Sequence, residues 1–452
     1  RFKGMYYYID NVYGFPLRSS LARNVESDGG CRLFHDVNIP FLYERKFFDG
    51  YHVTTNLKWK GDNRQAKEFL REIVLLIKAK ALLENSDLRR VEIVYFYPVS
   101  MSGSDRRQLR ETWEDLFRTY ISDNTDHLHN CTESLAPAAY YKGPDVDGAS
   151  YVSIDIGGGT SDVVIYQPTP DGMGSQPVVI SSFRFAGNAI FGDAFVQQDA
   201  ARNPLLEHYT RYFKQLIASD RSCNISYLTS ILDKITAQQR SEDINAFLFS
   251  IENVEELRGL REIDRNLYSY NALLRNDGQR KIIFMYFYSA IIYYIASMMH
   301  ARGYRMPKQL YFSGTGSKIL NIVGNASMVT ELSKLIFEKV YGQRYTERFT
   351  LKIETECPKQ ITCRGGVKML GDNDAPTFTP REVNALKFNY SMLDHEGLTL
   401  AGIKTVETRE AITQRVKEFN QFFIELCDSD MRDDFGIDRN VFKVFGEVVN
   451  DD

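Results

Sequence analysis

The chain has 452 residues, which is too long for one simple hydrophobic core, so we expect two or more lobes. Hydrophobic residues make up 43% of it and charged residues 25%, as in an ordinary soluble globular protein. The formal net charge of −4 gives no electrostatic basis for binding DNA or RNA. The six cysteines lack the CxxC spacing of a zinc site or a disulfide scaffold, and they fit reduced thiols in the cytoplasm.

The first part of the chain predicts a mixture of strands and helices. Residues 1–56 combine Tyr, Phe and Arg with short extended segments at 5–9 and 39–43, which predict irregular β structure. Apolar residues on one face predict an amphipathic helix over 64–83. A strand over 91–97 follows, which Pro98 ends. Next comes a second helix, whose apolar face carries Leu109, Trp113, Leu116, Phe117 and Tyr120.

The segment that follows this helix contains two histidines and a cysteine. His127 and His129 precede Cys131 at alternate positions. Without a second group of ligands, this pattern is more typical of loop polarity than of a metal site. Residues 131–141, CTESLAPAAYY, then predict a short helix of small residues.

The stretch 153–167, SIDIGGGTSDVVIYQ, is the most informative part of the sequence. An extended apolar run enters three glycines at 157–159, and extended character resumes afterwards, which predicts a hairpin. Glycines let the backbone approach a ligand, and a turn of exposed N–H groups suits a phosphate. Asp155 before the glycines is suited to hydrated Mg²⁺, and Thr160 to a terminal phosphate, with Asp162 two residues on. The alternative is a glycine hairpin that only turns the chain.

A turn, a strand and helices follow the hairpin. Residues 168–177 predict a turn, and residues 178–185 predict a strand that ends in the run AGNAIFGDAF. A helix is expected over 195–217, and the charged region 218–275 is expected to be helical. We predict no chemistry in this region.

Residues 282–299 form 18 consecutive uncharged positions, long enough to span a bilayer. Four tyrosines, two serines and a place just before a strand argue against a membrane span. A helix that is apolar on all sides is also typical of the buried interior of an α/β domain. We therefore expect a buried helix.

Residues 309–313 predict a strand that leads into the glycine turn 314–319, GTGSKI. Small residues at the carboxyl end of a strand let a base and a ribose lie on the backbone. Further on, a helix with Ile412, Val416, Phe419, Phe423 and Leu426 on one face is expected. The aspartates between 428 and 434 predict a solvated surface, because Arg432 stands where a calcium loop needs a ligand.

The order of these motifs resembles the actin, sugar-kinase and heat-shock-chaperone ATPase superfamily. The stretch 153–167 resembles its second phosphate motif, and 314–319 resembles its adenosine motif. The run 186–195 resembles the glycine turn of its second lobe, and 361–370 resembles the last crossing to the first lobe. The implied fold is the two-lobed α/β, actin-like ATPase (ribonuclease H-like) fold.

The resemblance implies a site for ATP and Mg²⁺, with roles for individual residues. By this resemblance, the phosphates would be bound by Gly157, Gly158, Gly159 and Thr160, and Mg²⁺ would be held through water by Asp155. Glu133 would orient the attacking water. The adenosine would be bound by Gly314, Gly316 and Ser317. The alternative for Glu133 is that it only caps a helix. In the heat-shock relatives, the region that corresponds to residues 218–275 of this chain forms a small subdomain that closes over the adenine.

The first phosphate motif of the superfamily, an Asp followed by Gly and Thr or Ser, does not occur. The nearest run, residues 9–14, lacks the hydroxyl. Because the sequence begins with Arg1, we expect an N-terminally truncated chain whose first motif lies upstream. The expected first lobe is 1–150, the second 151–360, and a return helix with an extension 361–452. Residues 365 and 366, both glycines, are expected to permit close helix packing.

The predicted function is that of a cytoplasmic ATP-binding protein with no membrane span, which hydrolyses ATP to drive lobe closure. Its output would be that of a filament former or a chaperone-like ATPase, with self-association or a protein partner. A degenerate pseudo-ATPase scaffold and a small-molecule kinase remain alternatives, because a substrate pocket and the first phosphate motif are not identified.

Overall fold

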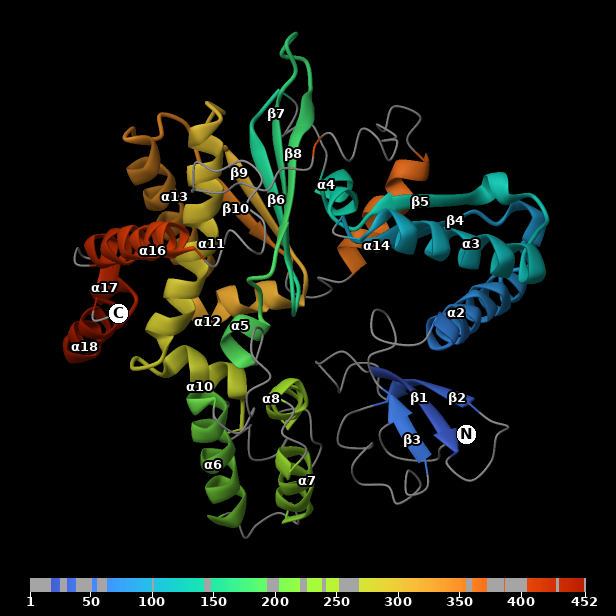
Figure 1. Cartoon of the computed structure of the whole chain (residues 1–452), viewed down its shortest axis with the longest axis horizontal. Helices are drawn as coiled ribbons and strands as arrows, with labels where there is room; N and C mark the ends of the chain where they lie inside the picture. The colour runs from blue at the N-terminus through green and yellow to red at the C-terminus, as the bar shows by residue number, and fades with distance from the viewer. Residues whose placement is uncertain are drawn as a thin grey trace. The chain divides into compact units, whose positions relative to one another are not determined.

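The structure, a computed structural model, describes fourteen parts of the chain, and these divide into two compact units (Figure 1). The described residues are 18–24, 31–37, 51–54, 63–99, 101–141, 148–192, 203–219, 226–237, 241–251, 268–354, 360–371, 386, 405–427 and 431–450. The first unit comprises Arg1–Tyr97, Met101–Asn130 and Phe191–Tyr270, and the second comprises Pro98–Ser100, Cys131–Ile190 and Asn271–Asp452. The lobe boundaries expected from the sequence remain a prediction.

The second unit is organised around a mixed five-stranded sheet in the order β10-β9-β6-β7-β8. Its strands are β6 (Tyr151–Ile156), β7 (Ser161–Pro168), β8 (Ser175–Phe183), β9 (Gln309–Ser313) and β10 (Thr350–Ile353). β6, β9 and β10 run parallel, whereas β7 is antiparallel to both β6 and β8. The hairpin predicted over 153–167 and the strand predicted over 309–313 are therefore confirmed.

Alternating side chains of the sheet face two different helical layers, which Figure 1 shows on its two sides. One layer contains α4 (Leu135–Tyr141) and α14 (Gln360–Gly371), and the other contains α11 (Lys281–Ala301) and α13 (Ala326–Tyr341). On the α11 side, Phe312 contacts Tyr288 and Phe183 contacts Tyr294. The core on the α4 side consists of Val99, Leu135, Ala138, Tyr151, Val164, Tyr166, Ile180 and Tyr311.

Among the described residues, α11 is the helix that is long and apolar enough to cross a membrane, and 72% of its most apolar window is buried inside the protein. It packs against α13 and α16 (Val406–Cys427) as well as the sheet. Tyr286 and Tyr293 contact Phe419 of α16. This burial is what the core-helix interpretation of residues 282–299 requires, since a helix enclosed by other elements needs no polar face.

The C-terminal part contains α16, α17 (Met431–Asp434) and α18 (Arg439–Asn450). The helix expected from the sequence is present as α16. Phe423 and Leu426 near its end are buried, but Ile412 is 39% exposed and Val416 is 49% exposed. The continuous buried face that the sequence suggested therefore exists only in the last turns, because no described element covers the first half of that face.

Two helices of the second unit, α4 and α14, cross unusually closely at Gly365. A Cβ added at this residue would lie 1.8 Å from the carbonyl oxygen of Ala136 and 3.3 Å from the backbone nitrogen of Tyr140. No side chain fits in that space. The close helix packing expected at residues 365 and 366 is thus confirmed for Gly365.

The first unit contains a three-stranded antiparallel sheet, a two-stranded sheet formed by β4 and β5, and several helices. The three-stranded sheet has the order β2-β1-β3. The first unit also contains the helices α2 and α3, whose shared core includes Val74, Trp113 and Phe117. The described elements are β1 (Arg18–Asn24), β2 (Cys31–Val37), β3 (Tyr51–Thr54), α2 (Asn63–Leu83), β4 (Ile93–Tyr97), α3 (Gly103–Tyr120), β5 (Leu128–Thr132), α6 (Pro204–Ser219), α7 (Ser226–Ala237) and α8 (Ser241–Ser250).

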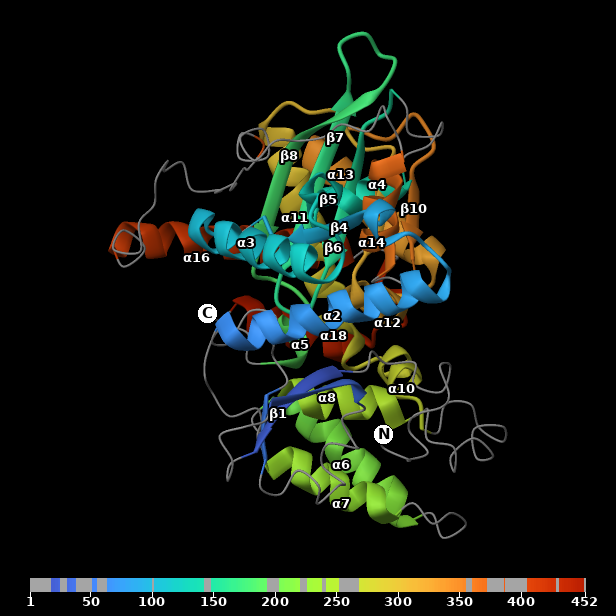
Figure 2. The same cartoon turned by 90° about the vertical axis from the view of Figure 1, so that its right-hand side faces the viewer.

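These elements confirm most of the expected secondary structure, including the helices over 64–83 and within 218–275. The extended segments at 5–9 and 39–43 lie outside the described residues. The helix expected over 195–217 is described from Pro204, because residues 193–202 also lie outside the described part. The view in Figure 2 shows α2 and α3 along their lengths.

Candidate functional site

The centre of the candidate site is the tip of the β6–β7 hairpin. Asp155 pairs with Asp162 and Ile156 with Ser161, so residues 157–160 form the loop. The N–H group of Gly157 donates to the carbonyl oxygen of Thr160 at 2.9 Å, which closes this loop. The prediction that residues 153–167 form a hairpin with the three glycines in its turn is therefore confirmed.

A second loop holds the carbonyl groups of this tip. The N–H group of Gly187 donates to the carbonyl oxygen of Gly157 at 3.1 Å, and the N–H group of Asn188 donates to that of Gly158 at 2.7 Å. Asn188 begins the short helix α5 (Asn188–Phe191). The N–H groups of Gly158 and Gly159 form no backbone hydrogen bond within the described part of the chain. The loop carbonyls are thus fixed from one side while these N–H groups stay available, as in an anion-binding turn.

A third loop, at the end of β9, contacts the end of β6 through two glycines. Gly314 has φ +81°, and a Cβ added there would lie 2.4 Å from Asp155 Oδ1 and 2.4 Å from the carbonyl oxygen of Ile156. A Cβ added at Gly316 would lie 2.6 Å from the carbonyl oxygen of Gly157. Only glycine fits at these two positions. The turn 314–319 and the hairpin tip, distant in sequence, are therefore in direct contact.

Within this third loop, Ser317 is fully buried and its hydroxyl donates to the carbonyl oxygen of Ser313. Its N–H group also donates to the carbonyl oxygen of Gly314 at 3.2 Å. The loop is a short 3₁₀ turn, η8 (Thr315–Ile319), followed by α12 (Leu320–Val323). Ser317 therefore shapes the turn, and a contact with a nucleoside remains a prediction.

A row of polar side chains crosses the sheet beneath the hairpin tip. Ser313 is in register with Asp155, Asp155 with Asp162, and Asp162 with Ser182. Ser313 Oγ donates to Asp155 Oδ2 at 3.0 Å. Ser134 Oγ, from the segment before α4, donates to Asp162 Oδ1 at 3.4 Å. The row lies at the carboxyl end of the parallel strands β6 and β9, the edge at which open α/β sheets bind ligands.

Glu133 lies in the same segment as Ser134 and is partly buried. The cap of α4 comes from its neighbour, since the N–H group of Leu135 donates to Thr132 Oγ1 at 3.2 Å. Thr132 thus caps the first turn of α4, and the role of Glu133, in orienting water or in capping the helix, stays a prediction. The structure adds three residues to the candidate site that were not predicted from the sequence: Ser134, Ser313 and Asn188.

The other sequence patterns do not form metal sites in the described part of the chain, where no group of three metal-ligating side chains occurs. His129 Nε2 lies 3.6 Å from Glu92 Oε2. Burial raises the pKa of the Cys131 thiol to about 12, and its sulfur donates towards Met369 Sδ at 3.7 Å. Asp428 and Asp430 lie outside the described residues, and Asp433 pairs with Arg432 at 2.9 Å.

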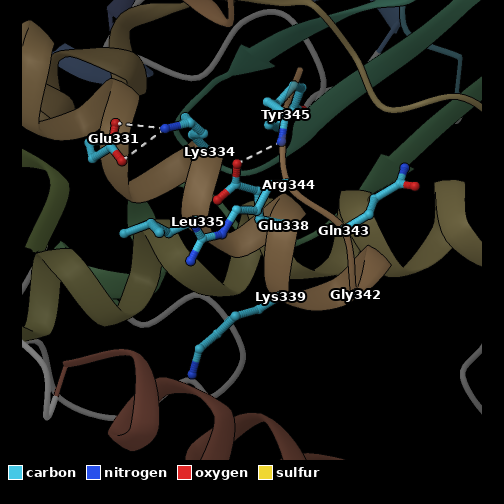
Figure 3. A pocket seen from close by; sticks show the side chains of 9 residues that line it. All are labelled: Glu331, Lys334, Leu335, Glu338, Lys339, Gly342, Gln343, Arg344 and Tyr345. Carbon is cyan, nitrogen blue, oxygen red and sulfur yellow. Dashed lines mark hydrogen bonds and ion pairs between the residues drawn. The ribbon is translucent and has the colours of Figure 1, made fainter. Parts of the chain in front are cut away.

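A cavity of about 530 Å³ lies elsewhere in the second unit, at the end of α13 (Figure 3). Lys334 pairs with Glu331 at 3.2 Å, and the N–H group of Tyr345 donates to Glu338 Oε1 at 2.7 Å. The lining of this cavity contains none of the residues predicted to bind nucleotide. The lining residues are Glu331, Lys334, Leu335, Glu338, Lys339, Gly342, Gln343, Arg344 and Tyr345.

No protein-family model matches the chain, and no curated protein matches it. Among solved structures, MreB5 of Spiroplasma citri bound to ADP is 13% identical, with a TM-score of 0.35, and the match covers 79% of this chain and 91% of that one. MreB5 of the same organism bound to AMPPNP is 13% identical, with a TM-score of 0.34 and coverage of 77% and 87%. TM-scores of this size do not establish a shared fold.

Proposed function

We propose that this chain is a nucleotide-binding protein of the actin-like ATPase superfamily and that it binds Mg-ATP at the β6–β7 hairpin tip. One observation carries the proposal: the loops 157–160, 187–188 and 314–316 meet at the carboxyl end of β6. Each loop contains at least one glycine, and the sequence order of the three resembles that of the superfamily motifs. A glycine hairpin that only turned the chain would not need two further glycine loops in contact with its tip.

The phosphates would bind to the backbone of the tip. A Cβ added at Gly159 would meet no heavy atom within 4 Å, so the space beside this residue is open. The N–H groups of Gly158 and Gly159 have no backbone partner in the described part, and a phosphate oxygen would accept hydrogen bonds from them. Thr160 follows directly, and its hydroxyl would contact the γ-phosphate. The loop therefore fits an anionic group.

The metal would be held through water by Asp155, with Asp162 beside it. Because the two residues are paired across the antiparallel strands, their carboxylates stand on the same face of the sheet. Two adjacent carboxylates and the phosphates of a nucleotide make up the oxygen-rich surroundings that Mg²⁺ prefers. Bound Mg²⁺ would supply charge neutralisation for the phosphates.

The remaining roles follow the same arrangement. Only glycine fits at positions 314 and 316, and the adenosine would contact the backbone at Gly314 and Gly316. Ser317 would shape this turn through its hydrogen bond to Ser313. Glu133 would orient the attacking water as a hydrogen-bond acceptor. Phosphoryl transfer to water needs mainly positioning and charge stabilisation, which these groups would provide.

The test is the ATP affinity of Asp155→Ala and Thr160→Ala variants, measured by calorimetry with Mg²⁺ present. Asp171→Ala is the matched control. Asp171 is an exposed aspartate in the turn between β7 and β8, where its carboxylate accepts a hydrogen bond from the Thr169 hydroxyl. We expect weaker ATP binding for the first two variants and no change for the third. Unchanged affinity and turnover in both site variants would refute the proposal.

A pseudo-ATPase scaffold is the second candidate, since the sequence holds no Asp-x-Gly-Thr or Asp-x-Gly-Ser motif before residue 151. It would bind ATP without turnover. Single-turnover hydrolysis separates this candidate from an ATPase, and ATP-dependent sedimentation separates a filament former from a chaperone-like enzyme or a kinase.

A further inference from the structure

The two carboxylates of the proposed metal site stand directly opposite each other on neighbouring strands. Asp155 and Asp162 form a cross-strand pair, and like charges in such a pair repel each other. Repulsion favours rotamers that turn the two carboxylates apart. Hydrogen bonds that hold the two carboxylates in place before the cation arrives would lower the cost of binding one cation with both.

Each carboxylate receives a hydrogen bond from a buried serine. Ser313 Oγ donates to Asp155 Oδ2 at 3.0 Å, and Ser134 Oγ donates to Asp162 Oδ1 at 3.4 Å. The two serines come from β9 and from the segment before α4. Ser313 is 0% exposed and Ser134 is 3% exposed. Buried hydroxyl groups do not exchange freely with water, so the 3.0 Å hydrogen bond from Ser313 fixes the direction of the Asp155 carboxylate, and the longer contact from Ser134 restrains that of Asp162 more weakly.

We propose that Ser313 and Ser134 are positioning residues that orient Asp155 and Asp162 towards one hydrated Mg²⁺ ion. This inference rests on the proposed function of the same site. Outer partners of this kind orient metal ligands, and their loss typically lowers metal affinity roughly 10- to 100-fold. The serines do not touch the nucleotide, and they act through the two aspartates.

Both serines also belong to segments that have roles of their own. Ser313 is followed by Gly314, where an added Cβ would lie 2.4 Å from Asp155 Oδ1, so the turn 314–319 and the first carboxylate pack closely together. Ser134 follows Glu133 and precedes α4, so the second carboxylate is tied to the segment proposed to orient water. Metal binding would therefore order the adenosine turn and the Glu133 segment together.

The experiment compares ADP binding with EDTA and with Mg²⁺, using calorimetry on the full chain. The measured quantity is the factor by which Mg²⁺ tightens ADP binding. We expect this factor to fall roughly 10-fold or more in Ser313→Ala and by a smaller factor in Ser134→Ala, with the affinity in EDTA unchanged. Ser313→Thr keeps a hydroxyl and should retain most of the factor.

Ser153→Ala is the matched control. Ser153 is a buried serine two residues before Asp155 on β6, in register with Tyr311 rather than with a carboxylate. Its substitution should leave the Mg²⁺ factor unchanged. Thermal unfolding of every variant identifies any that is misfolded, and Ser134→Ala tests the proposal if Ser313→Ala does not fold.

The outcomes separate this inference from the function on which it rests. If the wild-type chain and Asp155→Ala differ in their Mg²⁺ factor but both serine variants match wild type, the positioning role is refuted and the proposed site stands. If the wild-type chain binds ADP in neither condition, the proposed function is refuted and the inference falls with it.

Discussion

Substitution of Gly159 by alanine should weaken nucleotide binding without harming the fold. A Cβ at this position would meet no heavy atom within 4 Å, and the residue is not among the glycines with positive φ. Alanine is therefore compatible with the folded backbone, and its effect on stability should lie between none and a gain of about 1 kcal/mol. The new methyl group would occupy the open space proposed for the phosphates.

The expected loss of affinity follows from the hydrogen bonds at stake. If the methyl group displaces a phosphate from one backbone N–H, the loss is about 1.5–3 kcal/mol for a hydrogen bond to a charged group. That corresponds to a roughly 10- to 150-fold weaker ATP affinity. Calorimetry measures the affinity, and thermal unfolding measures the stability of the same samples.

Gly103→Ala provides the control for this experiment. Gly103 begins α3, and a Cβ added there would also meet no heavy atom within 4 Å, but it lies outside the candidate site. Both variants should unfold at or above the wild-type temperature, and only Gly159→Ala should bind ATP more weakly. A folded Gly159→Ala chain with wild-type affinity would refute the placement of phosphates on this loop.

Three further predictions concern packing and thiol chemistry. Gly365→Ala should destabilise the chain by about 3 kcal/mol in a chemical denaturation experiment, because the added Cβ would lie 1.8 Å from the Ala136 oxygen; stability equal to wild type would contradict the α4–α14 crossing. Iodoacetamide should modify the exposed Cys363 long before Cys131, whose pKa burial raises to about 12; mass spectrometry showing equal rates would contradict this. Burial raises the pKa of the Cys131 and Cys427 thiols in the folded chain. The contribution of these buried neutral thiols to the free energy of unfolding should therefore be complete below about pH 8.5 and should be lost as the pH rises towards 12. A free energy of unfolding that stays constant across this pH range would contradict the prediction.

Local patterns in the sequence predicted the hairpin, the strand 309–313, the helix over 282–299 and the glycine turns, because each depends on residues that are close in the chain. The Asp155–Asp162 pairing was also within reach. The two residues lie equally far from the centre of the loop 157–160, so an antiparallel hairpin without a bulge must place them opposite each other.

The serine contacts could not be predicted in this way. Ser134 and Ser313 reach the hairpin from segments 28 and 158 positions away from their partners, and nothing in their local sequence specifies the partner. Likewise, the helical period predicted one apolar face for α16 but not that Ile412 and Val416 would stay exposed. Such contacts depend on how elements pack, which periodicity does not encode.

The central claim is that the β6–β7 hairpin binds Mg-ATP, and calorimetric titration of the full chain with ATP tests it most directly. The titration is performed with and without Mg²⁺, on the wild type and on Asp155→Ala. We predict that the wild type binds ATP more tightly with Mg²⁺ and that Asp155→Ala loses this gain. A wild-type chain that binds no ATP, or an Asp155→Ala variant with the full Mg²⁺ gain, would contradict the claim.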